Sequence, residues 1–116
     1  MILVDTSVWV DHFRKGHPDL IRLLADGDVV MHPMILGELA CGQLPKRSKT
    51  LQFLADLPHL DVESDVTVLH ALESRHWHGT GVGWVDSHLL TSALVARVRL
   101  WTTDARLGWL ARAAGI

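Results

Sequence analysis

The chain opens on an apolar run, Met1 to Val4, that stops at Asp5 and is followed by Thr6 and Ser7. Four consecutive apolar residues are typical of a strand buried on both faces, as strands are in a parallel sheet. Ligands bind at the carboxyl ends of such strands, so we expect Asp5 to lie in a functional site. The alternative is that Asp5 or Thr6 only caps the helix that follows, since both residue types favour that position.

Short apolar runs alternate with helical patterns along the rest of the chain. We expect further strands at residues 28–31 and 98–101 and a weak strand at residues 60–62. Helices are predicted at residues 8–15, 18–25, 33–42, 46–57, 65–77, 85–97 and 105–113, with Ser64 able to cap the fifth. This alternation favours a parallel sheet with helices on both faces. Gly115 and Ile116 end the chain where another strand would begin, so that edge strand is expected to be rudimentary or missing.

Length and composition favour one domain, residues 1–116. With 116 residues, of which 48% are apolar, the chain can bury a core without disulfides. The one cysteine, Cys41, has a helical apolar context that predicts a small core residue in a reducing compartment. The net charge of −2 lacks the basic excess with which proteins hold duplex nucleic acid by charge alone. Neither a signal peptide nor an apolar stretch of membrane length is visible, so we expect a cytoplasmic protein.

Four acidic residues stand where exposure on the surface does not explain them: Asp5, Glu38, Asp86 and Asp104. Asp104 ends the strand at residues 98–101 as Asp5 ends the first strand, which would bring both carboxylates to one edge of the sheet. Glu38 shares a helix face with apolar side chains, and Asp86 begins a very apolar helix. A carboxylate on an inward face is costly unless it is paired or bound to a metal.

Each acid also has a structural explanation. Asp86 and Asp104 can favour a helix dipole from the first turn, and Glu38 can pair with a buried arginine. The four together, with no matching set of inward bases, favour a cation site, and hard oxygen ligands suit Mg²⁺ or Mn²⁺. Without a cation, like charges raise one another's pKa and should destabilise the fold. Asp5 then becomes a cation ligand, which leaves Thr6 as the better candidate for the helix cap.

Three segments, MILVDTSVWVDHF, GWVDSHLLTSALVA and LWTTDARL, with Glu38 in a helix between the first two, resemble the PIN-domain ribonucleases. More closely, they resemble the VapC toxins of bacterial toxin–antitoxin pairs, and the resemblance covers nearly the whole chain. It implies an α/β, PIN-like three-layer fold, in which a central parallel sheet of four to five short strands is flanked by helices.

The same resemblance implies a function. Asp5, Glu38, Asp86 and Asp104 would be the catalytic acids that hold one or two divalent cations, Mg²⁺ with Mn²⁺ able to substitute. Thr6 and Thr102 would be the supporting hydroxyls. The protein would be a metal-dependent endoribonuclease that cuts single-stranded or looped RNA, forms a homodimer and is held inactive by a VapB-type antitoxin. Such a cation lowers the pKa of water and neutralises the phosphate, with Asp86 or Asp104 as candidate proton acceptor.

Two other classes of function fit parts of the pattern. Haloacid-dehalogenase-like phosphatases also begin with a strand that ends in aspartate, but their chemistry requires a second acid two residues later, where this chain has Ser7. A catalytically idle PIN-like binding module would be expected to have lost some of the four acids, and all four are present.

Two residues near the acids are candidates for contact with RNA or the antitoxin. Arg106 lies one helical step past Asp104, where it can meet a substrate phosphate or the antitoxin. Trp84 follows the glycine-rich residues 79–83 and is a candidate for stacking on a base. Those glycines lack the lysine and the spacing of a Walker phosphate-binding loop.

Histidines raise the possibility of zinc. His70, His76, His78 and His88 lie close together in the sequence, but His76 and His78 are two residues apart and do not face each other on a helix. No cysteine partners occur at zinc spacing. We therefore expect surface histidines rather than a zinc site.

Overall fold

A computed structural model describes all 116 residues, and its centre is a sheet of three short parallel strands in the order β2-β1-β3. The strands are β1 (Ile2–Val4), β2 (Val29–Val30) and β3 (Arg99–Trp101). In the register of β1 with β3, Val4 lies opposite Trp101. The residues that follow these two strands therefore emerge side by side at one edge of the sheet.

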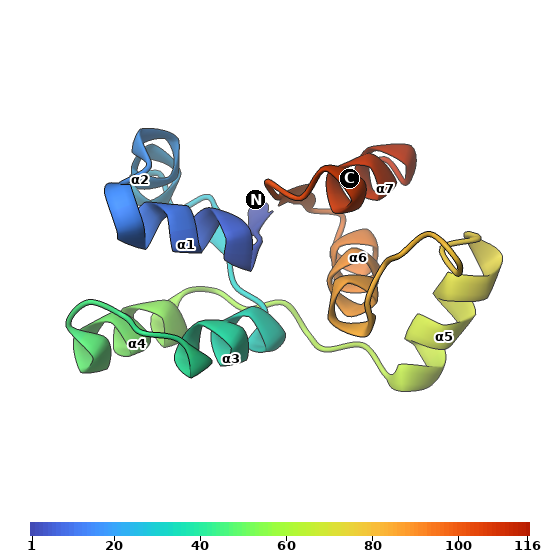
Figure 1. The fold of residues 1–116 in the computed structure, drawn as a ribbon, viewed down its shortest axis with the longest axis horizontal. Helices are drawn as coiled ribbons and strands as arrows, with labels where there is room; N and C mark the ends of the chain where they lie inside the picture. The colour runs from blue at the N-terminus through green and yellow to red at the C-terminus, as the bar shows by residue number, and fades with distance from the viewer.

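Seven helices surround the strands (Figure 1). They are α1 (Thr6–Lys15), α2 (Pro18–Ala25), α3 (Pro33–Cys41), α4 (Arg47–Asp56), α5 (Asp65–Ser74), α6 (Trp84–Ala96) and α7 (Ala105–Ala113). In Figure 1, α1 to α4 occupy one half of the elongated molecule and α5 to α7 the other. None of these helices is both long and apolar enough to span a lipid bilayer.

The helices begin where the sequence supplies start signals. Pro18 and Pro33 open α2 and α3, where a missing N–H costs nothing. The Ser64 hydroxyl accepts from the backbone N–H of Thr67 at 3.2 Å, which confirms Ser64 as the cap of α5. The Asp104 carboxylate caps α7 in the same way.

The core has two hydrophobic clusters, and α6 contributes to both. Leu89 and Ala93 of α6 pack in the larger cluster with the sheet and the first four helices. Leu90 packs in the smaller cluster with Leu107 and Leu110 of α7. Because α6 is buried on several sides, the acid in its first turn is held in a fixed place relative to both halves of the molecule.

The predicted sheet of four to five strands is wrong, because only three strands form. The weak strand expected at residues 60–62 is replaced by a single parallel bridge between Met31 and His59. The chain then leaves the sheet, since the Asp61 carbonyl accepts from the Ser92 hydroxyl of α6 at 2.9 Å. At the other end, Ile116 N–H donates to Ala111 O at 2.9 Å, so the chain turns back on α7 and makes no edge strand.

The expectation that Cys41 is a core residue is also wrong. Cys41 is the last residue of α3 and is exposed. The helix ends there, so the apolar periodicity no longer decides which way the side chain faces.

Candidate active site

Asp5 directly follows β1 and is tied to β3 by its backbone, since its N–H donates to Trp101 O at 2.9 Å. It occupies the cap position before α1, but its side chain makes no capping bond. The side chain is 7% exposed and therefore needs polar partners. The prediction that Thr6 caps α1 is wrong, because Thr6 is the first residue of the helix and its hydroxyl bonds elsewhere.

Two hydroxyls hold one oxygen of the Asp5 carboxylate. Thr102 donates to Asp5 Oδ2 at 2.7 Å, and Ser7 donates to the same oxygen at 2.9 Å. Hydrogen bonds to a carboxylate are shorter and stronger than neutral ones, so the pair fixes the orientation of Asp5. Oδ1 makes no hydrogen bond to the protein. Sequence reasoning missed Ser7 as a partner, although the spacing of a hydroxyl two residues after a strand-end acid was a usable signal.

The segment after β3 is locked to the same hydroxyls. The Thr102 hydroxyl accepts from the backbone N–H of Asp104 at 3.0 Å, and the Ser7 hydroxyl accepts from that of Thr103 at 3.1 Å. Asp104 Oδ1 in turn accepts from the N–H groups of Arg106 and Leu107 at 2.9 and 3.0 Å. Asp104 was expected to favour a helix dipole from the first turn, but it lies one position earlier and caps α7 with Oδ1, while Oδ2 makes no protein hydrogen bond.

Glu38 approaches the site from α3. The Thr6 hydroxyl donates to Glu38 Oε1 at 3.0 Å, which links the start of α1 to the middle of α3. The side chain is exposed, so the expectation that Glu38 lies on the inward face is wrong. Met34 is half-buried and Ile35 fully buried on the same helix, and Glu38 lies at the border of that face rather than within it.

Asp86 is the acid whose chemistry is most changed by its surroundings. It lies in the first turn of α6, is partly buried and has no hydrogen-bond or ion-pair partner in the protein. Its pKa is raised from the usual 3.8 to about 6, mainly by burial and then by the charges of Asp5, Asp104 and Glu38, in that order. The four carboxylates named by the sequence therefore share one electrostatic environment.

The residues present fit a hard divalent cation. All four candidates are carboxylates, and no lysine, arginine or histidine forms an ion pair with any of them. The repulsion at Asp86 is the force that a bound cation would relieve. No three acidic, histidine or cysteine side chains are close enough to chelate one ion alone. Mg²⁺ does not require such a group, because it usually keeps several waters and takes only one or two carboxylates.

A small cavity of about 40 Å³ opens beside Asp86 and Asp104. Arg106 lines it from α7, and Gly81 and Val82 line it from the loop before α6. Trp84, the first residue of α6, is 41% exposed next to this loop. The structure thus places Arg106 in a cavity with two of the acids, whereas Trp84 does not line that cavity and packs against His88.

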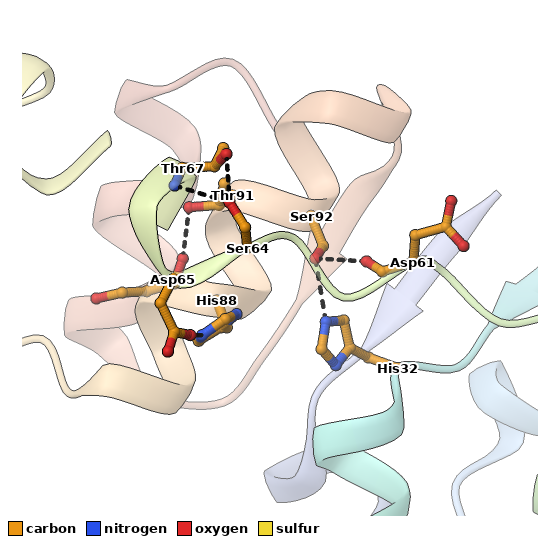
Figure 2. A network of polar contacts seen from close by, with 9 residues as sticks. His32, Asp61, Ser64, Asp65, Thr67, His88, Thr91 and Ser92 are labelled. Carbon is orange, nitrogen blue, oxygen red and sulfur yellow. Dashed lines mark hydrogen bonds and ion pairs between the residues drawn. The ribbon is translucent and has the colours of Figure 1, made fainter. Parts of the chain in front are cut away.

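Two histidines, His32 and His88, are buried. His88 belongs to the group of histidines expected on the surface, so that expectation is wrong for His88. His88 is 1% exposed, and its ring lies perpendicular to that of Trp84, with 4.8 Å between the ring centroids. Its Nε2 lies 3.3 Å from Asp65 Oδ1 (Figure 2). His70, His76 and His78 are exposed as expected. No group of side chains provides a zinc site.

His32 was not singled out by sequence reasoning. Its Nδ1 accepts from Met34 N–H at 3.0 Å and caps α3. Nε2 therefore carries the hydrogen and donates to the Ser92 hydroxyl of α6 at 3.0 Å, and that hydroxyl donates to Asp61 O (Figure 2). The usable signal was a polar residue directly before Pro33, the first residue of a helix. The network joins α3, which carries Glu38, to α6.

The sequence model of the family described as PIN domain matches residues 2–115. An α/β chain with a parallel sheet and this acidic edge, matched over almost its full length, belongs to the PIN-domain family. The chain is 44% identical over 108 residues to Ribonuclease VapC32 of Mycobacterium tuberculosis, in both the CDC 1551 / Oshkosh and the ATCC 25618 / H37Rv strains. The alignment covers 92% of this chain and 87% of the relative. The predicted resemblance to VapC-type PIN ribonucleases is therefore confirmed.

Proposed function

We propose that this chain is the endoribonuclease toxin of a VapBC-type toxin–antitoxin module. The observation that supports the proposal is that the charges of Asp5, Asp104 and Glu38 all raise the pKa of Asp86, in a chain that is 44% identical to a VapC ribonuclease. The phosphatase alternative is not favoured, because position 7 supplies a serine that supports Asp5 instead of a second acid. An idle binding module would have no use for an electrostatic arrangement that raises the pKa of Asp86.

Asp5, Glu38, Asp86 and Asp104 would hold one or two divalent cations, Mg²⁺ by preference. When bound, such a cation supplies positive charge to the scissile phosphodiester and makes water a better nucleophile at neutral pH. Two of these acids have one oxygen fixed by hydrogen bonds and the other free to bind a cation. Ser7 and Thr102 orient the Asp5 carboxylate, and the backbone of α7 orients that of Asp104. Thr6 supports Glu38 in the same manner.

Asp86 is the proposed proton acceptor. Its pKa is raised to about 6, which is near neutrality, so it can take a proton from the attacking water and release it again. Asp104 is less suited because one of its oxygens already accepts two backbone N–H groups. The water oxygen bonds to phosphorus as the P–O3′ bond breaks, and the departing O3′ takes up a proton from Asp86 or from solvent, which leaves a 5′-phosphate and a 3′-hydroxyl.

Single-stranded or looped RNA is the proposed substrate class. An exposed tryptophan at the start of the helix that carries Asp86, Trp84, offers a surface for base stacking, which is tolerant of sequence and worth about 1–3 kcal/mol per base. Because the chain has a net charge of −2, charge alone would not hold RNA, and local contacts together with bound cations would do so.

A VapB-type antitoxin and a second copy of the chain are the proposed protein partners, in the cytoplasm. A cavity of about 170 Å³ beside Glu38 is lined by the apolar side chains of Val10 and Phe13 and by Arg14. An antitoxin segment seated there would cover the approach to Glu38. We further propose that residues 1–116 act as a single PIN domain.

The proposed function is tested by incubating the purified protein with a pool of randomised single-stranded RNA in Mg²⁺, in Mn²⁺ and in EDTA. We expect cleavage in both metals and none in EDTA, with product ends that ligate as 5′-phosphates. Equal cleavage in EDTA, or products with cyclic phosphate ends, would contradict the metal-dependent mechanism. Size-exclusion chromatography with light scattering of the same sample tests the homodimer.

A further inference from the structure

The guanidinium of Arg106 lies directly on the backbone of Gly81. A Cβ atom built on Gly81 would overlap Arg106 Nη1 and would stand 2.8 Å from Cζ, closer than carbon atoms approach without contact strain. Gly81 also has φ +89°, a conformation that other residues rarely adopt. The guanidinium of Arg106 therefore occupies space that a side chain at residue 81 would take.

The place that Arg106 reaches is the cavity of about 40 Å³ that Asp86 and Asp104 also line. Arg106 is exposed, and its side chain makes no hydrogen bond or ion pair within the protein. Among the residues that line this cavity it is the one cation. A guanidinium has five N–H donors in a planar fork that matches the oxygens of a phosphate, and here all of them are free.

An internal role does not account for this position. If Arg106 served to neutralise the acids, it would form an ion pair with Asp86 or Asp104 within 4 Å. No such pair exists, although all three residues line the same cavity. The guanidinium is held near the acids but apart from them, where a group carrying its own negative charge can enter.

We propose that Arg106 binds a phosphate of the RNA next to the acidic site and that Gly81 is the positioning residue that admits its guanidinium. This inference rests on the proposed ribonuclease function and adds a substrate contact to the same site. The fork would grip two oxygens of one phosphate of the bound strand, while the acids act on the scissile bond.

The chain offers a matched control for Gly81. Gly79 lies in the same loop with φ +73°, but a Cβ atom there would meet no atom within 4 Å. Gly79→Ala therefore adds backbone strain alone, whereas Gly81→Ala adds strain and displaces Arg106. We expect both variants to lower Tm, and only Gly81→Ala to raise the KM for a fluorescein-labelled single-stranded RNA oligonucleotide of mixed sequence, by about tenfold or more.

A double-mutant cycle separates displacement of Arg106 from strain. Arg106→Gln should raise KM about 10- to 100-fold, and Gly81→Ala should add no further increase in the Arg106→Gln background. Arg106→Lys keeps the charge and loses the fork, so it should recover part of the affinity. An increase in KM that is equal for Gly79→Ala and Gly81→Ala, or additive effects in the cycle, would overturn the inference.

A binding measurement distinguishes failure of this inference from failure of the proposed function. Fluorescence anisotropy of the same oligonucleotide is recorded against salt concentration in EDTA, where no cleavage is expected. Loss of one phosphate contact in Arg106→Gln should reduce the slope of log K against log salt by about 0.7 for a single strand. If wild type cleaves RNA but Arg106→Gln shows the same salt slope as wild type, only the role of Arg106 is refuted. A wild type that binds RNA but never cleaves it would refute the proposed function and leave this contact standing.

Discussion

The hydroxyl of Thr102 donates to Asp5 Oδ2 at 2.7 Å, across a separation of 97 residues in the sequence. The contact exists because β1 and β3 are parallel neighbours, so the residues that follow Val4 and Trp101 emerge together. The same hydroxyl accepts from Asp104 N–H, and one side chain therefore fixes the relative positions of two of the proposed cation ligands.

Thr102→Val should impair the site more than the fold. The change keeps the shape of the side chain but removes the donor to Asp5 and the acceptor for Asp104 N–H, while Ser7 still holds Asp5. We expect a stability loss of about 1–2 kcal/mol and a rise of about 10- to 100-fold in the Mg²⁺ concentration for half-maximal cleavage. Thr102→Ser, which keeps the hydroxyl, is the control, and an equal rise in that variant would contradict the assigned role.

Asp86→Asn should stabilise the metal-free protein at neutral pH. The raised pKa favours the protonated acid in the folded state, so the stability contributed by Asp86 is present below about pH 3.8 and lost as pH rises through about 6. Removing the charge should gain about 1–2 kcal/mol at pH 7.5 after allowance for solvent screening, and little at pH 4. Urea unfolding in EDTA at both pH values measures this, and a clear loss at pH 7.5 would mean that the ionised acid is structural.

His32 should make the fold sensitive to acid. Burial lowers its pKa from 6.5 to about 4, with smaller contributions from His88 and His59. Its contribution to stability is therefore full above pH 6.5 and is lost as pH falls through about 4, by up to about 3 kcal/mol.

His32→Asn tests this sensitivity, because asparagine can still cap α3 but does not titrate. The variant should be less stable than wild type at pH 7, since the bond to Ser92 is lost. The difference in the free energy of unfolding should shrink between pH 6.5 and pH 4, as measured by urea titration at each pH. A difference that stays constant over this range would show that His32 is not the titrating group.

Much of the fold could be predicted because it depends on local signals. The seven helices follow from apolar periodicity and from the prolines, Ser64 and Asp104 at their starts. The number of strands could not be predicted in this way, because pairing depends on partners far away in the sequence. The Asp61 carbonyl accepts a hydrogen bond from Ser92 of α6 instead of pairing with a strand. No pattern near residue 61 in the sequence indicates this contact.

The acids could be named from their positions, but their surroundings could not. Asp5 and Asp104 were expected at one edge of the sheet because parallel strands end together, and the register of Val4 with Trp101 provides this. The exposure of Glu38, the raised pKa of Asp86 and the bond from Ser7 to Asp5 depend on how the helices pack. The contact of Arg106 with Gly81 depends in addition on a backbone angle that the sequence does not encode in any simple pattern.

The most direct test of the account is metal-dependent cleavage of RNA by wild type and by Asp5→Asn, prepared in parallel. Asp5 supplies the free oxygen that Ser7 and Thr102 hold in place, and asparagine is the same size without the charge. We expect wild type to cleave in Mg²⁺, to stop in EDTA and to recover when Mg²⁺ is restored, while Asp5→Asn is slower by at least about 100-fold. Cleavage by Asp5→Asn at the wild-type rate, or cleavage by wild type that persists in EDTA, would contradict this expectation.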